Sequence, residues 1–384
     1  MNHDRYNIVL LGPSYPYRGG IASFTDRLAR EFNAAGHQTL LCTFSLQYPS
    51  FLFPGKTQYS DTPSPKDLHI KRWVNTINPL NWIRIGRRLR KMNPDLIIVR
   101  YWMPFMAPSM GTILKMVKSN HHTKVICIAD NIIPHEKRLG DKLLTSYFVN
   151  SIDAFVVMSN QVKDDLRNLG FDKKTSLLPH PLFDHFGTLL DQKIARSELK
   201  LPEDRPILLF FGLIRPYKGL DLLIQAMSDE RIRKTGSILI VAGEFYENKE
   251  KYMLLVKELN LEGSIQFYDE FIPEDKVQYY FSAADVLVQP YKTATQSGVT
   301  PLAMHFNLPM IVTKAGGLKE MVADDETGII TEITADSLAD GIIRFLNKGK
   351  QSFISPIENR KSHYSWKGFM QSLLQAYEDL LANT

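Results

Sequence analysis

Short apolar runs alternate with amphipathic stretches along almost the whole chain. The runs are apolar throughout and do not alternate with polar residues, which is typical of parallel strands covered by helices on both faces. In the first half we expect strands at Asn7–Gly12, Gln38–Phe44, Leu96–Val99, Lys124–Ala129, Ala154–Met158 and Ser176–Leu178. In the second half we expect them at Ile207–Gly212, Ser237–Ala242, Ile265–Tyr268, Val286–Gln289 and Met310–Thr313.

Helical patterns fill the intervals, and the first of them, Ile21–Ala35, places Phe24, Leu28 and Phe32 on one face. Further helices are predicted to begin near Gly219, Lys249, Glu274, Pro301 and Gly317. Two such series predict an α/β protein of two doubly wound, Rossmann-like domains, residues 1–185 and 186–363. The closing segment, residues 364–384, carries an apolar helical stripe and is expected to pack on a domain. The stretch from Ser45 to about Pro79 is predicted to be a long functional or mobile loop.

The composition fits this plan, because 384 residues with 44% apolar content suffice for two buried cores. No apolar run approaches the roughly 20 residues that span a bilayer, and the N-terminus lacks a signal-peptide layout. The two cysteines have neither metal-ligand spacing nor a disulfide pattern. We therefore expect a cytoplasmic protein.

The net charge of +5 is unevenly distributed. Residues 1–190 hold 24 Lys and Arg against 14 Asp and Glu, and the remainder holds 22 against 27. The excess of basic residues in positions 1–190 favours a phosphate-bearing partner, either nucleic acid or an anionic membrane. The alternative is an ordinary basic surface without such a partner. No nucleic-acid-binding motif is present, so nucleic acid is not expected.

Three turns are candidates for binding phosphate. Gly19 and Gly20 precede the first helix, where backbone amides favour an anion. Gly212 ends a strand and is followed by Arg215 and Lys218, two cations suited to a diphosphate. We expect Pro301 at the first position of a helix, preceded by Ser297, Gly298, Val299 and Thr300. The backbone amides of these four residues would form a second phosphate-binding site.

Taken in order, these segments resemble the retaining glycosyltransferases of family 4, which have the GT-B fold. The resemblance extends over nearly the whole chain and includes Ala242-Gly243-Glu244 and the segment from Leu308 to Glu320. It implies an N-terminal acceptor domain, a C-terminal domain for a nucleotide-sugar donor, and a terminal helix that crosses back to the first domain. It also implies that no cofactor or metal is required.

By this resemblance, Arg215 and Lys218 would be catalytic, because they neutralise the leaving diphosphate. Donor-binding roles would fall to Gly19, Gly20, Gly212, Glu244, Gln296, Ser297, Gly298, Val299 and Thr300. The leaving phosphate itself would accept the acceptor proton, so a carboxylate base is not required.

The sequence departs from the family at the Glu-x7-Glu motif, where Ala294 and Leu302 replace the two carboxylates. A Gln-Ser-Gly segment stands there instead, and we interpret it as the mark of a subgroup in which Gln296 and Ser297 hold the donor through neutral hydrogen bonds. In the first domain, Asp130 stands where the family commonly has His and is predicted to be catalytic or to bind a hydroxyl. The alternative is that it caps a helix. His135 and Glu136 are expected on the acceptor side.

Cations cluster at 84–91 beside Trp82, Ile83, Ile85 and Leu89, a pattern that favours an amphipathic helix lying on an anionic membrane. The alternative is a helix that covers the sheet and turns a solvated charged face outward. We therefore predict transfer of a hexose from a UDP- or GDP-sugar to a glycan or lipid-linked acceptor in cell-envelope polysaccharide or glycolipid synthesis. The protein would be cytoplasmic, and we hypothesise a peripheral position on the inner face of the plasma membrane. A nucleotide-sugar 2-epimerase of the same fold, or a non-catalytic nucleotide-sugar or membrane-binding protein, remains the alternative.

Overall fold

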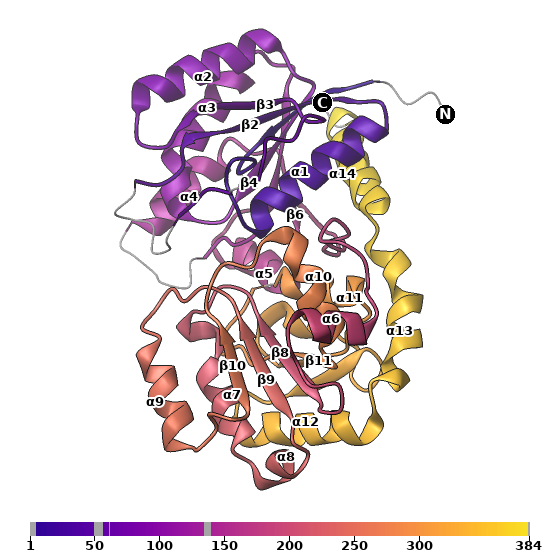
Figure 1. Ribbon diagram of the computed structural model, residues 1–384. Helices are drawn as coiled ribbons and strands as arrows, with labels where there is room; N and C mark the ends of the chain where they lie inside the picture. The colour runs from indigo at the N-terminus through magenta and orange to yellow at the C-terminus, as the bar shows by residue number, and fades with distance from the viewer. Residues whose placement is uncertain (1–4, 50–56, 61, 134–139, 296, 383–384) are drawn as a thin grey trace. The chain divides into compact units, whose positions relative to one another are not determined.

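The computed structural model describes residues 5–49, 57–60, 62–133, 140–295 and 297–382. Internal contacts divide the chain into two units: residues 1–179 with 366–384, and residues 180–365 (Figure 1). Each unit contains one parallel sheet with helices on both faces, which confirms the doubly wound α/β fold expected from the sequence.

The first unit is built on a seven-stranded sheet of order β3-β2-β1-β4-β5-β6-β7. All neighbouring strands pair in parallel. Its strands are β1 Asn7–Leu11, β2 Gln38–Leu46, β3 Ile70–Asn75, β4 Leu96–Tyr101, β5 Lys124–Ala129, β6 Ala154–Val157 and β7 Lys174–Leu177. Its helices are α1 Gly20–Ala34, α2 Pro79–Met92, the 3₁₀ turn η2 Pro104–Met106, α3 Ala107–Lys118, α4 Asp141–Val149, α5 Asn160–Asn168 and α14 Trp366–Ala382.

The second unit repeats the plan with six parallel strands in the order β10-β9-β8-β11-β12-β13. The strands are β8 Ile207–Phe211, β9 Ile238–Ala242, β10 Ile265–Tyr268, β11 Val286–Gln289, β12 Met310–Thr313 and β13 Gly328–Thr331. The helices are α6 Gln192–Glu198, η3 Pro216–Lys218, α7 Leu220–Met227, α8 Glu230–Lys234, α9 Glu250–Glu258, α10 Glu274–Ala283, α11 Val299–His305, η4 Gly316–Glu320, α12 Ala335–Lys348, α13 Gln351–Lys361 and η5 Ser362–Tyr364.

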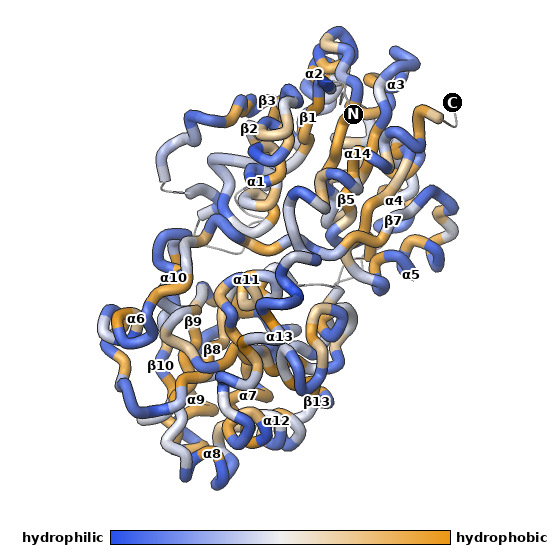
Figure 2. The backbone as a smooth tube through the Cα atoms, turned by 90° about the vertical axis from the view of Figure 1, so that its right-hand side faces the viewer, coloured by the Kyte–Doolittle hydropathy of each residue, from blue (hydrophilic) through white to orange (hydrophobic). Residues whose placement is uncertain are grey.

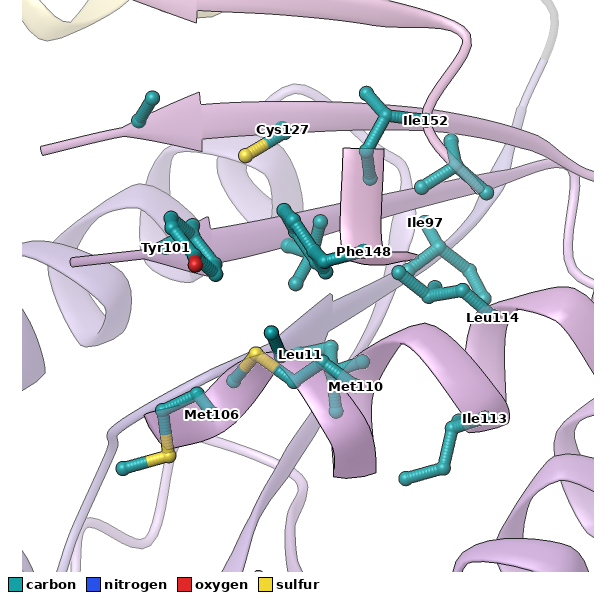
Figure 3. Packing of buried hydrophobic residues seen from close by; sticks show 14 of the residues in the cluster. Leu11, Ile97, Tyr101, Met106, Met110, Ile113, Leu114, Cys127, Phe148 and Ile152 are labelled. Carbon is teal, nitrogen blue, oxygen red and sulfur yellow. The ribbon is translucent and has the colours of Figure 1, made fainter. Parts of the chain in front are cut away.

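The core of the first unit lies between the sheet and the helices that cover it. The central strands β4 and β5 are almost entirely buried, because most of their side chains on both faces are apolar, and β5 runs mostly in the hydrophobic colour of Figure 2. Tyr101 of β4 stacks on Phe148 of α4 with ring centroids 4.3 Å apart, and methionines of η2 and α3 fill the space beside them (Figure 3).

The last helix completes the first unit, as the resemblance implied. Trp366 of α14 packs edge-on against Phe24 of α1 with centroids 4.8 Å apart, and the Arg27 guanidinium lies 5.0 Å from the Trp366 ring centre. At the other end of the helix, Asp379 pairs with Lys174 of β7 at 2.6 Å. The segment 180–365 is therefore inserted between two parts of one folded unit.

Every strand expected from the sequence is present, but three expectations need correction. The supposed loop from Ser45 to Pro79 contains β3, which pairs with β2 at the sheet edge. Helix α11 begins at Val299, so Pro301 is its third residue and not its first. This position is also free of an intrahelical N–H bond, so proline is tolerated there. Near Gly317 the chain forms only the 3₁₀ turn η4.

Candidate functional site

In both units the described residues of the predicted site lie just after the carboxyl ends of parallel strands. In the second sheet the strand order reverses between β8 and β11, which pair directly. Loops from two adjacent carboxyl ends diverge there and leave room for a ligand. Gly212, Arg215 and Lys218 follow β8, and the Ser297–Thr300 segment follows β11.

Lys218 is a buried lysine held over Gly212. Its Nζ lies 3.2 Å from the point where a Cβ on Gly212 would stand, and Val299 Cγ2 lies 3.6 Å from the same point. Gly212 also has a φ of 96°, a conformation that other residues rarely adopt. The structure therefore brings the predicted β8 turn and the start of α11 together around the Lys218 ammonium.

Arg215 is the residue before η3 and lies beside the same turn. Its carbonyl accepts a hydrogen bond from the Lys218 amide at 3.0 Å, and its guanidinium carbon lies 4.9 Å from the centre of the Tyr246 ring. Burial lowers the pKa of Lys218, and repulsion from the Arg215 charge lowers it further. An anion at this turn would relieve both costs, which is the electrostatic setting expected of a phosphate site.

The Ser297–Thr300 segment is tied down by a residue that the sequence analysis did not single out, Gln289 at the end of β11. Its side chain is 1% exposed. Its Nε2 donates to the Ser297 hydroxyl at 2.9 Å, and its Oε1 accepts from the Thr300 hydroxyl at 3.0 Å. A polar residue at the end of an apolar strand, Val286-Leu-Val-Gln, was the available signal.

These hydrogen bonds alter what the segment offers a ligand. Ser297 Oγ also accepts from the Val299 amide at 3.2 Å, so this amide already has a partner within the loop. Tyr291 stands next to the cluster, with its hydroxyl 3.4 Å from Ser297 Oγ and its ring centre 5.5 Å from Lys218 Nζ. Of the backbone amides predicted to bind phosphate, that of Val299 is therefore already hydrogen-bonded to the Ser297 hydroxyl.

Glu244 lies just after β9, beside the β8 turn. It is buried, and its backbone carbonyl accepts from the Ile214 amide at 2.9 Å. Gln296 lies outside the described residues, as do His135 and Glu136. Their predicted contacts stay predictions.

In the first unit, the corresponding edge holds Gly19, Gly20 and Asp130. Gly19 is the residue before α1 and has a φ of 103°, with open space where a side chain would stand. Gly20 is the first residue of the helix. Asp130 follows β5, and its amide donates to the Tyr101 carbonyl at 2.8 Å.

Asp130 forms a buried ion pair with Arg100, the penultimate residue of the neighbouring strand β4. Arg100 Nε donates to Asp130 Oδ2 at 2.9 Å, and Arg100 Nη2 donates to Oδ1. The guanidinium also lies over the Phe24 ring, 4.1 Å from its centre. Both carboxylate oxygens therefore accept from one cation, an arrangement that favours a positioning role over that of a proton acceptor.

Among the described residues, no group of three or more His, Cys, Asp or Glu side chains is placed to hold a metal ion. Cys42 and Cys127 are both buried within the sheet of the first unit, and burial raises the pKa of each thiol. Neither cysteine is therefore suited to act as a nucleophile or a metal ligand.

Two family models match the chain and together cover most of it. Residues 18–182 match the model described as Glycosyltransferase Family 4, and residues 191–360 match Glycosyl transferases group 1. A D-inositol 3-phosphate glycosyltransferase of Corynebacterium glutamicum is 24% identical over 314 residues, which are 77% of this chain and 75% of that protein.

Solved structures share the fold. The sucrose-phosphate synthase of Thermosynechococcus elongatus superposes with a TM-score of 0.76 at 19% identity, over 99% of this chain and 100% of that one. HepE from Anabaena in complex with UDP gives 0.74 at 14% identity, over 97% and 100%. The same protein has been solved with UDP-glucose, with a TM-score of 0.70.

These likenesses confirm the GT-B fold, and the two family models establish membership. The chain belongs to the group 1/family 4 glycosyltransferases and is a retaining glycosyltransferase that uses a nucleotide sugar.

Proposed function

We propose that the protein transfers a hexose from a UDP- or GDP-sugar to a hydroxyl of a glycan or lipid-linked acceptor in cell-envelope polysaccharide or glycolipid synthesis. The main observation in support of this donor site is the position of the Lys218 ammonium, which is buried against Gly212 at the carboxyl end of β8 and lies next to Arg215. A buried cation of lowered pKa is costly unless an anion meets it, and a nucleoside diphosphate supplies that anion.

In the proposed reaction, the bond between the anomeric carbon and the diphosphate breaks as Arg215 and Lys218 take up the growing negative charge. The acceptor oxygen then attacks from the face that the diphosphate leaves, so the configuration at the anomeric carbon is retained. The departing phosphate accepts the acceptor proton. No protein carboxylate and no metal is assigned a step, in keeping with the pairing of Asp130 to Arg100.

Gln289 makes one side of this donor site rigid. Its side chain hydrogen-bonds to both Ser297 and Thr300 and so fixes the loop that leads into α11. Groups held in place in this way stabilise charge without having to reorganise during the reaction. With Ala294 and Leu302 at the positions of the family's carboxylates, we assign the ribose and sugar hydroxyls to Gln296, Ser297 and Glu244. Contacts from Gly19 and Gly20 to the donor are part of the same proposal.

UDP is the favoured donor nucleotide, because HepE, which shares the fold, binds UDP and UDP-glucose. The test is a thermal-shift screen with UDP, GDP, ADP and CMP. A ligand at 100 times its Kd stabilises the folded state by about 2.7 kcal/mol. We expect one uridine or guanosine diphosphate to raise Tm without added metal and in the presence of EDTA. If none of the four raises Tm, the donor-site assignment is wrong.

The reaction itself is tested by incubating the protein with the matching hexose donor and a glycan or lipid-linked acceptor. NMR of the product would show the same anomeric configuration as in the donor. An inverted product would contradict the proposed mechanism. Release of an epimerised sugar with no acceptor consumed would instead favour the 2-epimerase.

We also place the protein at an anionic membrane surface, as a peripheral enzyme that reaches a membrane-displayed acceptor. None of the helices formed by the described residues has the length and apolar character needed to span a bilayer. The support for membrane attachment is the cationic surface of the first unit, which includes the basic residues of helix α2.

A further inference from the structure

Helix α2 exposes one face that combines uncompensated cations with large apolar side chains. Leu80, Arg84, Arg87 and Lys91 follow one another at spacings of four, three and four residues, so they share one side of the helix. Leu80 is 78% exposed, and two further apolar side chains flank it: Ile77, 52% exposed in the preceding turn, and Ile83, 37% exposed. We call these six residues the α2 face.

The opposite side of α2 is fixed to the body of the first unit, so the α2 face cannot turn inward. Ile85 and Leu89 are buried in the core. Gly86 lies so close to α3 that an added Cβ would stand 2.8 Å from Met116 Cβ. Trp82 donates through Nε1 to the Asn75 carbonyl at 2.7 Å.

This packing corrects the apolar edge expected from the sequence. Ile85 and Leu89 face the protein interior, Trp82 is half-buried, and only Ile83 of the expected four is exposed. Ile77 and Leu80 at the start of the helix are exposed together with Ile83, and Met92 is exposed at the other end. Exposed side chains of this size gathered at one helix end indicate a surface that binds something.

The charge of the helix indicates what it binds. α2 carries Arg84, Arg87, Arg88, Arg90 and Lys91 and no acidic residue. Two of the five cations have local partners. The guanidinium carbon of Arg88 lies 3.8 Å from the centre of the Trp73 ring, and Arg90 donates to the Ser119 hydroxyl. Within the part of the chain that the structure describes, Arg84, Arg87 and Lys91 form no ion pair. Three exposed cations without an ion pair favour an anionic partner.

We propose that the α2 face is the membrane-binding surface of the protein, with Arg84, Arg87 and Lys91 on anionic phospholipid headgroups and Ile77, Leu80 and Ile83 at the acyl boundary. Helices that lie in the interface combine these two kinds of contact. A nucleic acid would satisfy the cations but would give the aliphatic side chains no apolar environment. The inference rests on the proposed function in one respect, namely that an acceptor displayed on a membrane explains why such a surface is useful.

The test is sedimentation of the full chain with vesicles of phosphatidylcholine alone or mixed equally with phosphatidylglycerol, at low salt. We expect binding to the mixed vesicles and little to the neutral ones. Because each cation near an anionic surface contributes about a fivefold factor, the triple variant R84Q/R87Q/K91Q should bind about a hundredfold more weakly. The variant L80S/I83S should also bind more weakly, and its residual binding should be more sensitive to salt.

A matched control removes three exposed cations elsewhere, K173Q/K234Q/K257Q, so that the net charge changes equally. It should bind like the unchanged protein. Equal weakening in the control and the α2 variant would show that only net charge matters and would overturn the proposal, as would unchanged binding of the α2 variant. Binding of tRNA in place of vesicles would overturn it in favour of a nucleic-acid partner.

The thermal shift with nucleotide separates this inference from the proposed function. The α2 variants should keep the full shift, because none of their residues lies at the donor site. If the unchanged protein responds to nucleotide but ignores anionic vesicles, only the membrane surface is wrong. If it binds vesicles and responds to no nucleotide, the proposed donor site is wrong and the membrane surface stands.

Discussion

Gln289 and Ser297 are joined by a hydrogen bond of 2.9 Å that crosses the loop between β11 and α11. The same side-chain amide accepts from Thr300, so one buried residue holds both ends of the loop's last turn. Of the two positions at which the resemblance implies carboxylates, Ala294 lies in this loop and Leu302 lies in α11, and neutral groups hydrogen-bond across the loop here.

Replacing Gln289 by Leu should loosen this loop. The hydroxyls of Ser297 and Thr300 would lose their partner, and a buried polar group left unpaired costs about 1–3 kcal/mol. We expect the free energy of unfolding to fall by that amount and the KM for the donor to rise about tenfold, with a smaller change in kcat. Urea denaturation and initial-rate kinetics measure the two effects. In a double-mutant cycle with Ser297→Ala, additive effects would show that the hydrogen bond carries no coupling.

Replacing Lys218 by Ala should separate activity from stability. Loss of a preorganised cation at the leaving diphosphate should lower kcat about 10²–10³-fold. The same change removes a desolvated ammonium, so the free energy of unfolding should stay equal or rise. Lys234→Ala on exposed α8 is the control and should leave turnover unchanged. A Lys218→Ala protein with normal turnover would refute the site.

Donor binding should depend on pH through Lys218. Burial and Arg215 lower its pKa in the free protein, whereas a bound diphosphate favours the charged form and raises it. Binding therefore takes up a proton between the two pKa values, and affinity falls as pH rises through the lowered pKa of the free protein. Calorimetric titration of UDP from neutral to alkaline pH measures this. A guanidinium stays charged throughout, so Lys218→Arg should abolish the alkaline loss.

Asp130→Ala should destabilise the first unit strongly. It leaves the Arg100 guanidinium buried without its carboxylate, which typically costs about 3–5 kcal/mol. The double variant Arg100→Met with Asp130→Leu removes both charges and should recover most of that loss in urea denaturation. If the double variant is stable yet its KM for acceptor rises, Asp130 contacts the acceptor. If its kinetics are normal, the pair has a structural role alone.

The sequence predicted most strands because buried parallel strands are continuous apolar runs. Strand β3 was missed because Ile70–Asn75 carries Lys71 and Arg72, as exposed edge strands do, and follows a proline-rich stretch. Strand β13 was missed because Gly328–Thr331 is a short run. In both cases pairing with a neighbouring strand, and not local composition, determines the structure.

The same reasoning predicted only part of the candidate site. Lys218 and Arg215 were found because glycine and charge adjoin a strand end. Gln289 and Arg100 were not, since each looks like the polar end of an apolar run until a partner distant in sequence is brought next to it. Gln289 acts on residues 8 and 11 positions away, and Arg100 on a residue 30 positions away. Sequence reasoning without such contacts cannot assign these roles.

The return of α14 to the first unit determines the order in which the protein is completed on the ribosome. The second unit is one uninterrupted segment, residues 180–365, so all of its parts have been synthesised before the last helix exists. The first unit is completed later, because Trp366 and the rest of α14 can cover Phe24 only after residues 180–365 have been synthesised. Synthesis that stops short of residue 366 would thus produce a complete second unit and a first unit whose core around Phe24 is uncovered.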